Sequence, residues 1–272
     1  MESGPPTVVH RSREALRKGY SPAVRRFELG SIAVYVAVMA GLAVRLLPHV
    51  GRTPWTFGLA LLLGFVAADF VSGFVHWAAD TWGAPEWPII GQALIRPFRE
   101  HHLDEKEITR HDFVETNGNN CFISFPAALA VALLPQGPGL ELNLFVAAFT
   151  GSLVLWVLFT NQFHKWSHLD RPPRAVAFLQ KLHLILPPEH HAVHHRAPYA
   201  KYYCITTGWL NEPLYRLGFF EGLERTITAL TGQLPREDDL GKSAALALVN
   251  LTQAPGEGSR PREVSIAISP EP

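Results

Sequence analysis

The sequence is short of cysteine, of charged residues and of any excess of one charge sign. It has two cysteines in 272 residues, too few for a disulfide framework or a four-cysteine zinc site. Charged residues make up 18% of the chain, against about 25% in a typical soluble domain. Lysine plus arginine and aspartate plus glutamate both number 24, so no overall positive field indicates nucleic acid as a partner.

What the sequence has instead is long apolar runs, at about residues 28–47, 56–79, 121–135 and 142–163. A membrane-spanning helix needs about 20 mostly apolar residues, and the first, second and fourth runs meet that length. The third run is shorter and contains Pro126, but only QGPGLE separates it from the fourth. We therefore expect these two runs to form a helical hairpin. The sequence predicts an all-α integral membrane protein with four transmembrane helices.

The two ends of the chain differ from this apolar middle. Residues 1–27 are polar and basic and lack the apolar core and cleavage site of a secretory signal peptide. Residues 233–272 gain proline and glycine and lose periodicity, which predicts a flexible tail. The residues between these two ends, 28–232, form the predicted membrane domain. Basic residues gather in the N-terminal segment and in the 80–120 loop, so we expect both termini and this loop on the cytoplasmic side.

Histidine is the unusual component, with thirteen residues. His10 and His49 are isolated, and ordinary surface or interfacial roles account for them. The other eleven lie at or beyond the ends of the second and fourth spans that we expect to face the cytoplasm. This distribution predicts a cytoplasmic, histidine-rich cap that binds metal.

The second span ends in DFVSGFVHWAAD, which has polar residues along one helical stripe. Asp69, Gly73, His76 and Asp80 recur at helical spacing, so they share a face. His76 and Asp80, one turn apart, can bind one ion from that face. Asp69 lies deep in an apolar run, where a carboxylate is costly. It is either a structural partner or a group that orients His76.

Two further motifs supply closely spaced imidazoles. In NQFHKWSH, His164 and His168 are four residues apart and share a helical face. In EHHAVHH, three imidazoles point to one side of a helix, with His190 at the border: His191, His194 and His195. Adjacent imidazoles repel one another when protonated, so we expect a cation to hold them neutral.

The charged run REHHLDEKE adds the pair His101–His102, although a solvated juxtamembrane helix would also explain that pair. The ligand candidates are then His76, Asp80, His101, His102, His164, His168, His191, His194 and His195. A catalytic zinc takes about three protein ligands, so nine candidates indicate two ions with four or five ligands each. Imidazole binds several transition metals alike. Because a lipid chain can reach this location and breaking its C–H bonds needs a redox metal and oxygen, a binuclear iron centre is favoured.

Other polar residues nearby are candidates for additional ligands or for groups that orient ligand rings. They are His111, His183, His190, Asp69, Glu100, Asp112 and Glu189. The segment WPIIGQALIRPF is expected to lie on the membrane surface. Its Arg96, together with Arg99, is a candidate for binding lipid phosphate.

Five stretches of the sequence resemble the plasmanylethanolamine desaturase family, and the resemblance covers about residues 60–235. These stretches are DFVSGFVHWAADTWG (69–83), IRPFREHHLDEKEITRHDFVETNGNNC (95–121), NQFHKWSH (161–168), ILPPEHHAVHH (185–195) and YYCITTGWLNEPL (202–214). The resemblance implies an oxidoreductase that uses molecular oxygen and two iron ions to convert the O-alkyl chain of a plasmanyl ethanolamine phospholipid into a vinyl ether. It implies electrons from a b-type cytochrome or a ferredoxin. The family's ligands fall on the nine positions named above.

Some features depart from related patterns, and other functions remain open. Asp80 and Phe98 stand where general acyl-lipid desaturases have histidine, and Tyr199 stands where some family members have histidine. We therefore do not expect position 199 to be an obligatory ligand. The alternatives are a desaturase or hydroxylase of a phospholipid acyl chain, a histidine-rich metal transporter or sensor, and a zinc hydrolase. The alanine- and arginine-rich composition indicates a bacterial inner membrane, or the endoplasmic reticulum for a eukaryotic chain.

Overall fold

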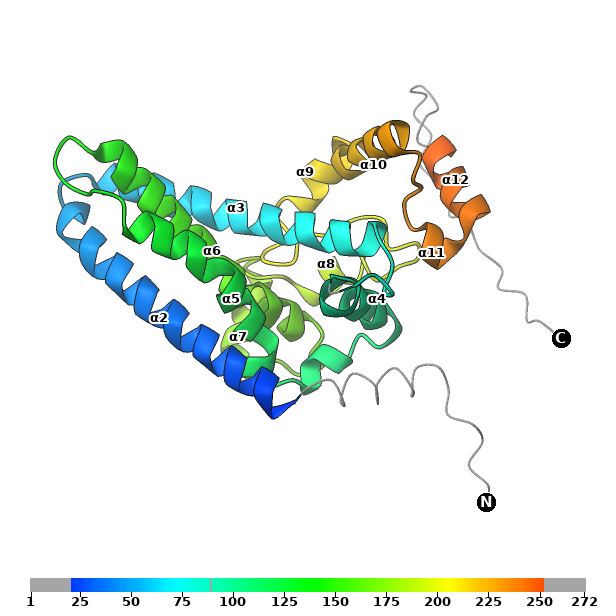
Figure 1. Ribbon diagram of the computed structural model, residues 1–272, viewed down its shortest axis with the longest axis horizontal. Coiled ribbons are helices and arrows are strands. Elements are labelled where there is room, and N and C mark those ends of the chain that lie inside the picture. The colour runs from blue at the N-terminus through cyan, green and yellow to red at the C-terminus, as the bar shows by residue number, and fades with distance from the viewer. Residues whose placement is uncertain (1–20, 89, 252–272) are drawn as a thin grey trace, which may run out of the picture. The chain divides into compact units, whose positions relative to one another are not determined.

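The computed structural model describes residues 21–88 and 90–251, and every regular element in these ranges is helical. The all-α prediction is confirmed for this part of the chain. Four long helices are α2 (Pro22–Val50), α3 (Pro54–Thr81), α5 (Phe113–Ala132) and α6 (Glu141–Ser167). They run side by side, and the α2–α3 and α5–α6 connections lie at the same end (Figure 1).

Three of these helices are long and apolar enough to cross a membrane. The mean hydropathy of an 18-residue apolar stretch is 1.9 in α2, 2.0 in α3 and 2.1 in α6. The predicted spans 28–47, 56–79 and 142–163 lie within them. The predicted span 121–135 differs: α5 begins at Phe113 rather than near residue 121, and its first half contains the polar run TNGNN. These polar residues explain why α5 does not reach the hydropathy of the other three.

Close contacts between the helices depend on small residues. On α3, a Cβ added at Gly64 would lie 2.5 Å from the carbonyl oxygen of Phe149, so only glycine lets α6 approach so closely. A Cβ at Gly118 of α5 would likewise lie 2.5 Å from the Glu28 side chain of α2. Apolar side chains fill the interior toward the connections: Leu42, Leu46, Phe57, Ala60, Val131, Leu144, Ala147 and Ala148.

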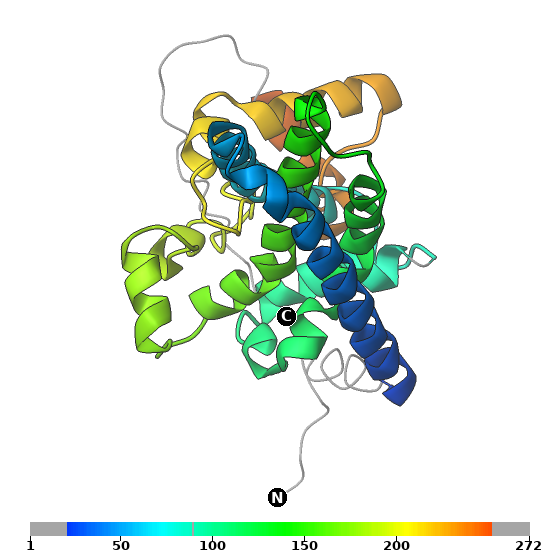
Figure 2. The same cartoon turned by 90° about the vertical axis from the view of Figure 1, so that its left-hand side faces the viewer.

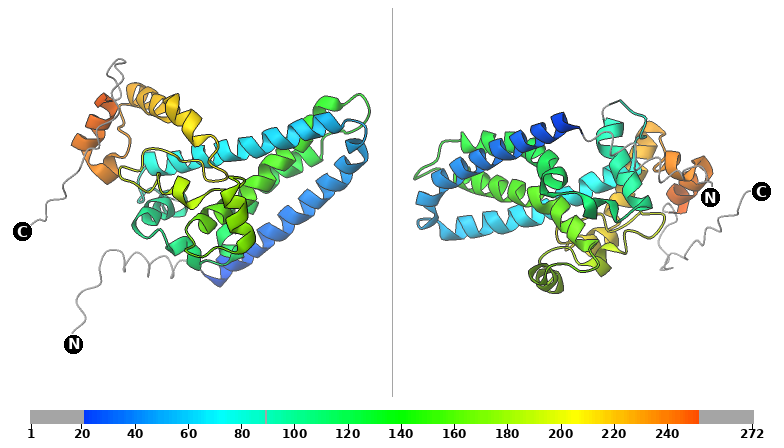
Figure 3. Two further views of the ribbon diagram at one scale, coloured as in Figure 1. Left: turned by 180° about the vertical axis from the view of Figure 1, so that it is seen from behind. Right: turned by 90° about the horizontal axis from the view of Figure 1, so that it is seen from below.

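The opposite end of the bundle, which we call the histidine end, holds the shorter elements. They are η1 (Gly91–Ile95), α4 (Arg96–Leu103), η2 (Glu107–Arg110), α8 (Pro188–His191) and α9 (Asn211–Arg216), while α7 (Arg174–Lys181) follows α6 in the chain. Figure 3 shows α4 and the loops around α8 at the end of the bundle away from the α2–α3 connection. The two segments rich in histidine therefore meet the ends of α3 and α6.

A second unit starts at Glu221 and includes most of α10 (Phe219–Thr231), α11 (Glu237–Leu240) and α12 (Lys242–Leu251). Its interior holds an ion pair between Arg236 and Glu224, with Nη2 2.9 Å from Oε1. The predicted tail, 233–272, thus contains two helices as far as residue 251. The run SAALAL in α12 consists of good helix formers, which the proline and glycine content of the tail obscured. Residues 1–20, with His10, and 252–272 lie outside the described residues.

Candidate metal centre

The nine ligand candidates predicted from the sequence come together at the histidine end in two groups. In each group, one possible ligand atom from every residue lies within 4.8 Å of the others. We call the first the five-histidine cluster: His101, His164, His168, His191 and His195. We call the second the mixed cluster: His76, Asp80, His102 and His194.

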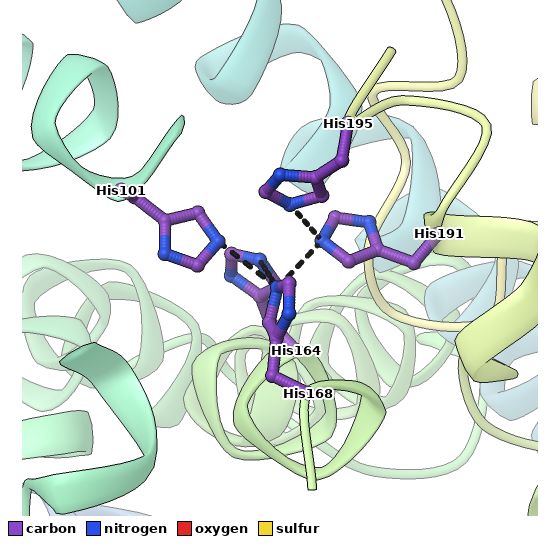
Figure 4. Close-up of side chains that lie close together, drawn as sticks. All are labelled: His101, His164, His168, His191 and His195. Atoms are coloured by element: carbon purple, nitrogen blue, oxygen red, sulfur yellow. Dashed lines mark hydrogen bonds between the residues drawn. The ribbon is translucent and has the colours of Figure 1, made fainter. Parts of the chain in front are cut away.

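The five-histidine cluster joins α4, α6 and the turn that follows α8 (Figure 4). The Nε2 atom of His168 lies 3.0 Å from that of His101, 3.0 Å from that of His191 and 3.2 Å from that of His164. The Nε2 atoms of His191 and His195 are 2.9 Å apart. Five ring nitrogens from segments up to 94 residues apart in sequence (101 to 195) therefore point at one small volume.

The mixed cluster lies against α3 and contains the one carboxylate of the two groups. Asp80 Oδ2 is 3.3 Å from His76 Nε2, 3.4 Å from His194 Nε2 and 3.7 Å from His102 Nε2. The Nε2 atoms of His102 and His194 are 3.0 Å apart. His76 and Asp80, four residues apart on α3, therefore face one histidine from α4, His102, and one from the EHHAVHH stretch, His194.

The polar stripe of α3 explains how the loop of residues 201–210 reaches the mixed cluster. A Cβ at Gly73 would lie 2.4 Å from the sulfur of Cys204, so glycine is needed for the loop to pack there. Asp69 is fully buried, and its carboxylate accepts the backbone N–H groups of Thr207, Gly208 and Leu210 at 2.7 to 3.1 Å. Of the two roles predicted for Asp69, these contacts are those of a structural partner.

This loop also orients two ligand rings. His76 Nδ1 donates to the carbonyl oxygen of Tyr203 at 3.1 Å, and His194 Nδ1 donates to that of Lys201 at 3.0 Å. A neutral imidazole that donates from Nδ1 presents a lone pair at Nε2. Backbone carbonyls thus turn the metal-binding nitrogen of both rings toward the mixed cluster.

The five-histidine cluster has a different neighbour, Glu105, which the sequence analysis missed. Its Oε1 lies 3.2 Å from His195 Nδ1, and its Oε2 lies 4.0 Å from His168 Nδ1. The next residue, Lys106, donates to the carbonyl oxygen of His168 at 2.7 Å and so ties this loop to the end of α6. The run HHLDE could have indicated this contact, because Glu105 follows His101 by four residues.

Burial keeps these imidazoles neutral. Loss of solvation, followed by the neighbouring charge of Lys106, lowers the pKa of His168 to about 4. Loss of solvation, followed by repulsion from His194, lowers the pKa of His195 to about 3. Burial and the surrounding histidines also hold the pKa of His101 and of His191 well below 6.5. At neutral pH these rings therefore offer lone pairs rather than positive charge.

A metal ion in each cluster fits these observations. A neutral imidazole has one N–H. His76 and His194 already donate theirs from Nδ1 to backbone carbonyls, so the Nε2 atoms of these two rings have no proton to donate. His76 Nε2 is buried and has no hydrogen-bond partner, which is costly unless a cation occupies the space before it. Imidazoles with a carboxylate are suitable ligands for iron, zinc, copper and nickel.

The other polar candidates lie outside both clusters. His111 lies between Glu107 and Glu115, with Nε2–Oε1 distances of 3.9 and 3.7 Å. Asp112 caps α5 by accepting the backbone N–H groups of Val114 and Glu115. These contacts join α5 to the histidine end.

The remaining candidates have other contacts. His183 and Glu189 are exposed, and the carbonyl oxygen of His183 accepts the indole N–H of Trp209 at 2.6 Å. The ring of His190 stacks on Tyr202, with centroids 4.8 Å apart. Glu100 accepts from Arg96 at 2.7 Å.

Two aromatic rings and one arginine complete the surroundings of the mixed cluster. Tyr199 lies parallel to His102, with centroids 4.2 Å apart, and Phe98 meets His76 edge-on at 5.1 Å. Tyr199, which is not expected to be an obligatory ligand, thus stacks on a candidate ligand. Arg99 donates from Nε to the carbonyl oxygen of Ala79 at 3.1 Å, next to Asp80.

Comparison with known proteins agrees with this geometry. Residues 65–238 match the lipid desaturase domain. The chain is 57% identical over 245 residues to a plasmanylethanolamine desaturase of Myxococcus xanthus, covering 89% of this chain and 85% of that protein. It is 45% identical to plasmanylethanolamine desaturase 1 of Mus musculus, over 85% of this chain and 87% of the mouse protein. A chloroplastic fatty acid desaturase 4 of Arabidopsis thaliana is 34% identical over 65% of this chain and 54% of its own. No solved structure matches.

Proposed function

This chain belongs to the lipid desaturase family, as the resemblance in its sequence predicted, and on that premise we propose that it desaturates an ether phospholipid. The reaction converts the O-alkyl chain of a plasmanyl ethanolamine lipid into a 1'-alkenyl vinyl ether, with molecular oxygen as co-substrate. The observation that carries the proposal is the convergence of nine side chains into two adjacent ligand groups. The names of the bacterial and mouse relatives support the choice of substrate.

We propose two iron ions as cofactors, one held by the five-histidine cluster and one by the mixed cluster. Bound iron would supply the oxygen activation and the cleavage of unactivated C–H bonds that acid–base side chains cannot provide. The chain's own contribution is to orient and to shield. The carbonyls of Tyr203 and Lys201 and the carboxylate of Glu105 fix the rings of His76, His194 and His195.

Aromatic rings shield one side of the mixed cluster. The face of Tyr199 covers His102, and the edge of Phe98 covers His76. Both contacts exclude water from the imidazoles that would hold the ion. Exclusion of water strengthens the electrostatic interactions of a site and protects reactive species from side reactions.

We propose that α5 crosses the membrane together with α2, α3 and α6, giving four spans. Arg45, near the end of α2, donates to the carbonyl oxygens of Ala132 and Leu134 at 2.5 and 2.9 Å. Because these carbonyls belong to the end of α5, both helices reach the same level at the end away from the histidines. The lysine and arginine residues of the N-terminal segment and of the 80–120 loop favour a cytoplasmic location for the termini and the histidine end.

The partners that we propose follow from the chemistry. Electrons come from a small carrier, a b-type cytochrome or a ferredoxin. The phosphate of the lipid binds Arg96 or Arg99, both of which lie next to the metal centre on α4. The membrane is the bacterial inner membrane, or the endoplasmic reticulum if the chain is eukaryotic.

The test is to supply an alkyl-ether phospholipid to cells that make this chain but no plasmalogen of their own. We expect acid-labile vinyl ethers to accumulate with the native chain, to stay absent with His194→Ala, and to require oxygen. Purified protein should contain two irons per chain. Activity with stoichiometric zinc, or activity without oxygen, would overturn the proposal.

A second function, desaturation of a phospholipid acyl chain, is favoured by one observation. The Arabidopsis relative, named as a fatty acid desaturase, shares 34% identity over 181 residues. Lipid analysis of the same cells separates the two functions. New double bonds in ester-linked acyl chains, with no vinyl ether, would support the second.

A further inference from the structure

Helix α7 has an exposed apolar face that the metal centre does not use. Phe178 is 60% exposed and Leu182 50% exposed, and Leu184 in the following loop is 41% exposed. Trp209, whose indole binds the backbone of this loop, is 40% exposed. We call these four residues the apolar face of α7. Adjacent large apolar side chains in water are unusual and indicate a surface that something covers.

The buried side of α7 packs beside the spanning helix α6. Val176 and Ile185 form one buried group with Phe163, and Trp156 packs against that group. Phe163 lies 4 residues before Ser167 (167 − 163), which is about 6 Å along the helix axis. Figure 2 shows α7, in yellow-green, to the side of the long helices rather than across their ends.

Trp209 gives a second, independent indication of depth. Its ring lies 5.3 Å from that of Phe65, and Phe65 lies 16 residues before Thr81 (81 − 65), or about 24 Å along α3. The indole N–H of Trp209 binds the carbonyl oxygen of His183. The loop after α7 is therefore level with the apolar length of α3, which is one of the candidate spans.

The charges of this segment suit a phospholipid surface. Residues 171–184 contain Arg171, Arg174 and Lys181, all exposed, and no aspartate or glutamate. Long basic side chains can keep their charge at the headgroups while their stems lie along apolar surface. Anionic lipid headgroups attract basic side chains that lie near the membrane surface.

We propose that residues 171–184 are embedded in the leaflet on the histidine side, with the apolar face of α7 among the acyl chains and the three basic side chains at the phosphates. The partner of this surface is the lipid bilayer. Because Ile185 to Pro188 lead directly from this segment into α8 and His191, lipids that contact α7 lie next to the metal centre. This inference goes beyond the proposed desaturation, since it rests on α3 and α6 being spans and not on any reaction.

The experiment measures depth with thiol-linked fluorophores on variants that each gain one exposed cysteine, in phosphatidylethanolamine–phosphatidylglycerol vesicles. The variants are Phe178→Cys and Leu182→Cys, with Asp170→Cys as the control, because Asp170 has an 86% exposed side chain that binds Lys106 at the histidine end. The native Cys121 and Cys204 are buried, so the labelled native chain gives the background. Quenching is compared between lipids brominated on their acyl chains and iodide in the water.

We expect the probes at 178 and 182 to be quenched severalfold more by brominated chains than the probe at 170, and severalfold less by iodide. Iodide quenching as strong at 182 as at 170 would overturn the inference. Self-quenching between copies at 182, without quenching by brominated chains, would also overturn it and assign the face to a second copy of the chain. The measurement needs neither iron nor turnover, so its failure is distinct from a failure of the proposed function.

Discussion

The two clusters at the histidine end use the same imidazole donors but are held in different ways. The mixed cluster contains a carboxylate, Asp80, which is 2% exposed, and the rings of His76 and His194 are fixed by backbone carbonyls. The five-histidine cluster has no acidic member. Its nearest described carboxylate, Glu105, faces the outer nitrogen of His195 and has a 45% exposed side chain.

This difference shows that each cluster depends on a separate part of the chain. The carbonyls behind the mixed cluster belong to the loop that Gly73 and Asp69 hold against α3. Glu105 belongs to the loop that Lys106 holds against the end of α6. If each cluster holds one ion, as we propose, a change in one loop should therefore affect that ion and leave the other in place.

Removal of one ligand from each cluster should have the largest effect. In His191→Ala and in His194→Ala we expect vinyl ether formation to fall below detection and bound iron to fall from two to about one per chain, because each cluster loses a metal ligand. His49→Ala, in the last turn of α2, is the matched control and should retain both irons. Iron and lipid analysis of the purified variants measures this. Loss of both irons in either variant would show that the clusters are one unit.

The sequence predicted which side chains come together because their grouping depends on local helical spacing. His164 and His168 share a face of any helix, and His76 and Asp80 do so on α3, so the spacing alone indicates shared ligation. The nine candidates converge because the two apolar hairpins bring the ends of α3 and α6 together. The two groups, of five and four residues, also agree with the prediction of two ions with four or five ligands each.

The groups that orient these ligands could not be predicted in the same way. Glu105 and the carbonyls of Tyr203 and Lys201 meet their histidines through loops whose paths no local periodicity fixes. The acidic neighbours in sequence were poor guides, since Asp112 caps α5 and Glu100 binds Arg96. For the same reason the position of α7 beside α6 could not be predicted from local periodicity.

Gly73→Ala should break the mixed cluster without touching a ligand. Its Cβ would lie 2.4 Å from the sulfur of Cys204 and 3.1 Å from the backbone nitrogen of Cys204, so the loop must move and carry the carbonyl of Tyr203 away from His76. Overpacking of this kind costs about 1–3 kcal/mol. We expect a lower melting temperature and loss of about one iron per chain, by analogy with ligand removal.

The matched control for this change is Gly58→Ala, on the same helix, where an added Cβ meets nothing within 4 Å. It should retain stability, iron and activity. If Gly73→Ala keeps both irons while its melting temperature falls, the loop stabilises α3 but does not orient His76.

Glu105→Gln should affect the five-histidine cluster alone. The amide keeps the size of the side chain but removes the charge that faces His195 and His168. Loss of an outer partner of a metal-binding histidine typically costs about 10- to 100-fold in metal affinity or activity. We expect the affinity for one of the two irons to fall by that factor, so that a chelator removes this iron more easily than the other. Glu105→Asp should have an intermediate effect.

Glu107→Gln is the control, since Glu107 lies on the same loop and binds Arg110 rather than a cluster. Competition of a chelator for each iron, followed by the absorption of the remaining iron, measures the effect. Equal loss of both irons in Glu105→Gln would remove the distinction between the clusters.

Acid should change stability rather than metal content, and it should sharpen the comparison in the metal-free protein. Because the pKa values of His168 and His195 are lowered to about 4 and about 3, the unfolded chain binds protons below about pH 6.5 that the folded chain does not. The free energy of unfolding should fall as the pH falls below that value, by about 1.4 kcal/mol per pH unit for each proton. Unfolding in detergent micelles between pH 7 and 4.5 measures the slope. His195→Gln should reduce the slope by about one proton, because glutamine does not titrate, whereas an unchanged slope would mean that His195 takes up its proton equally in both states.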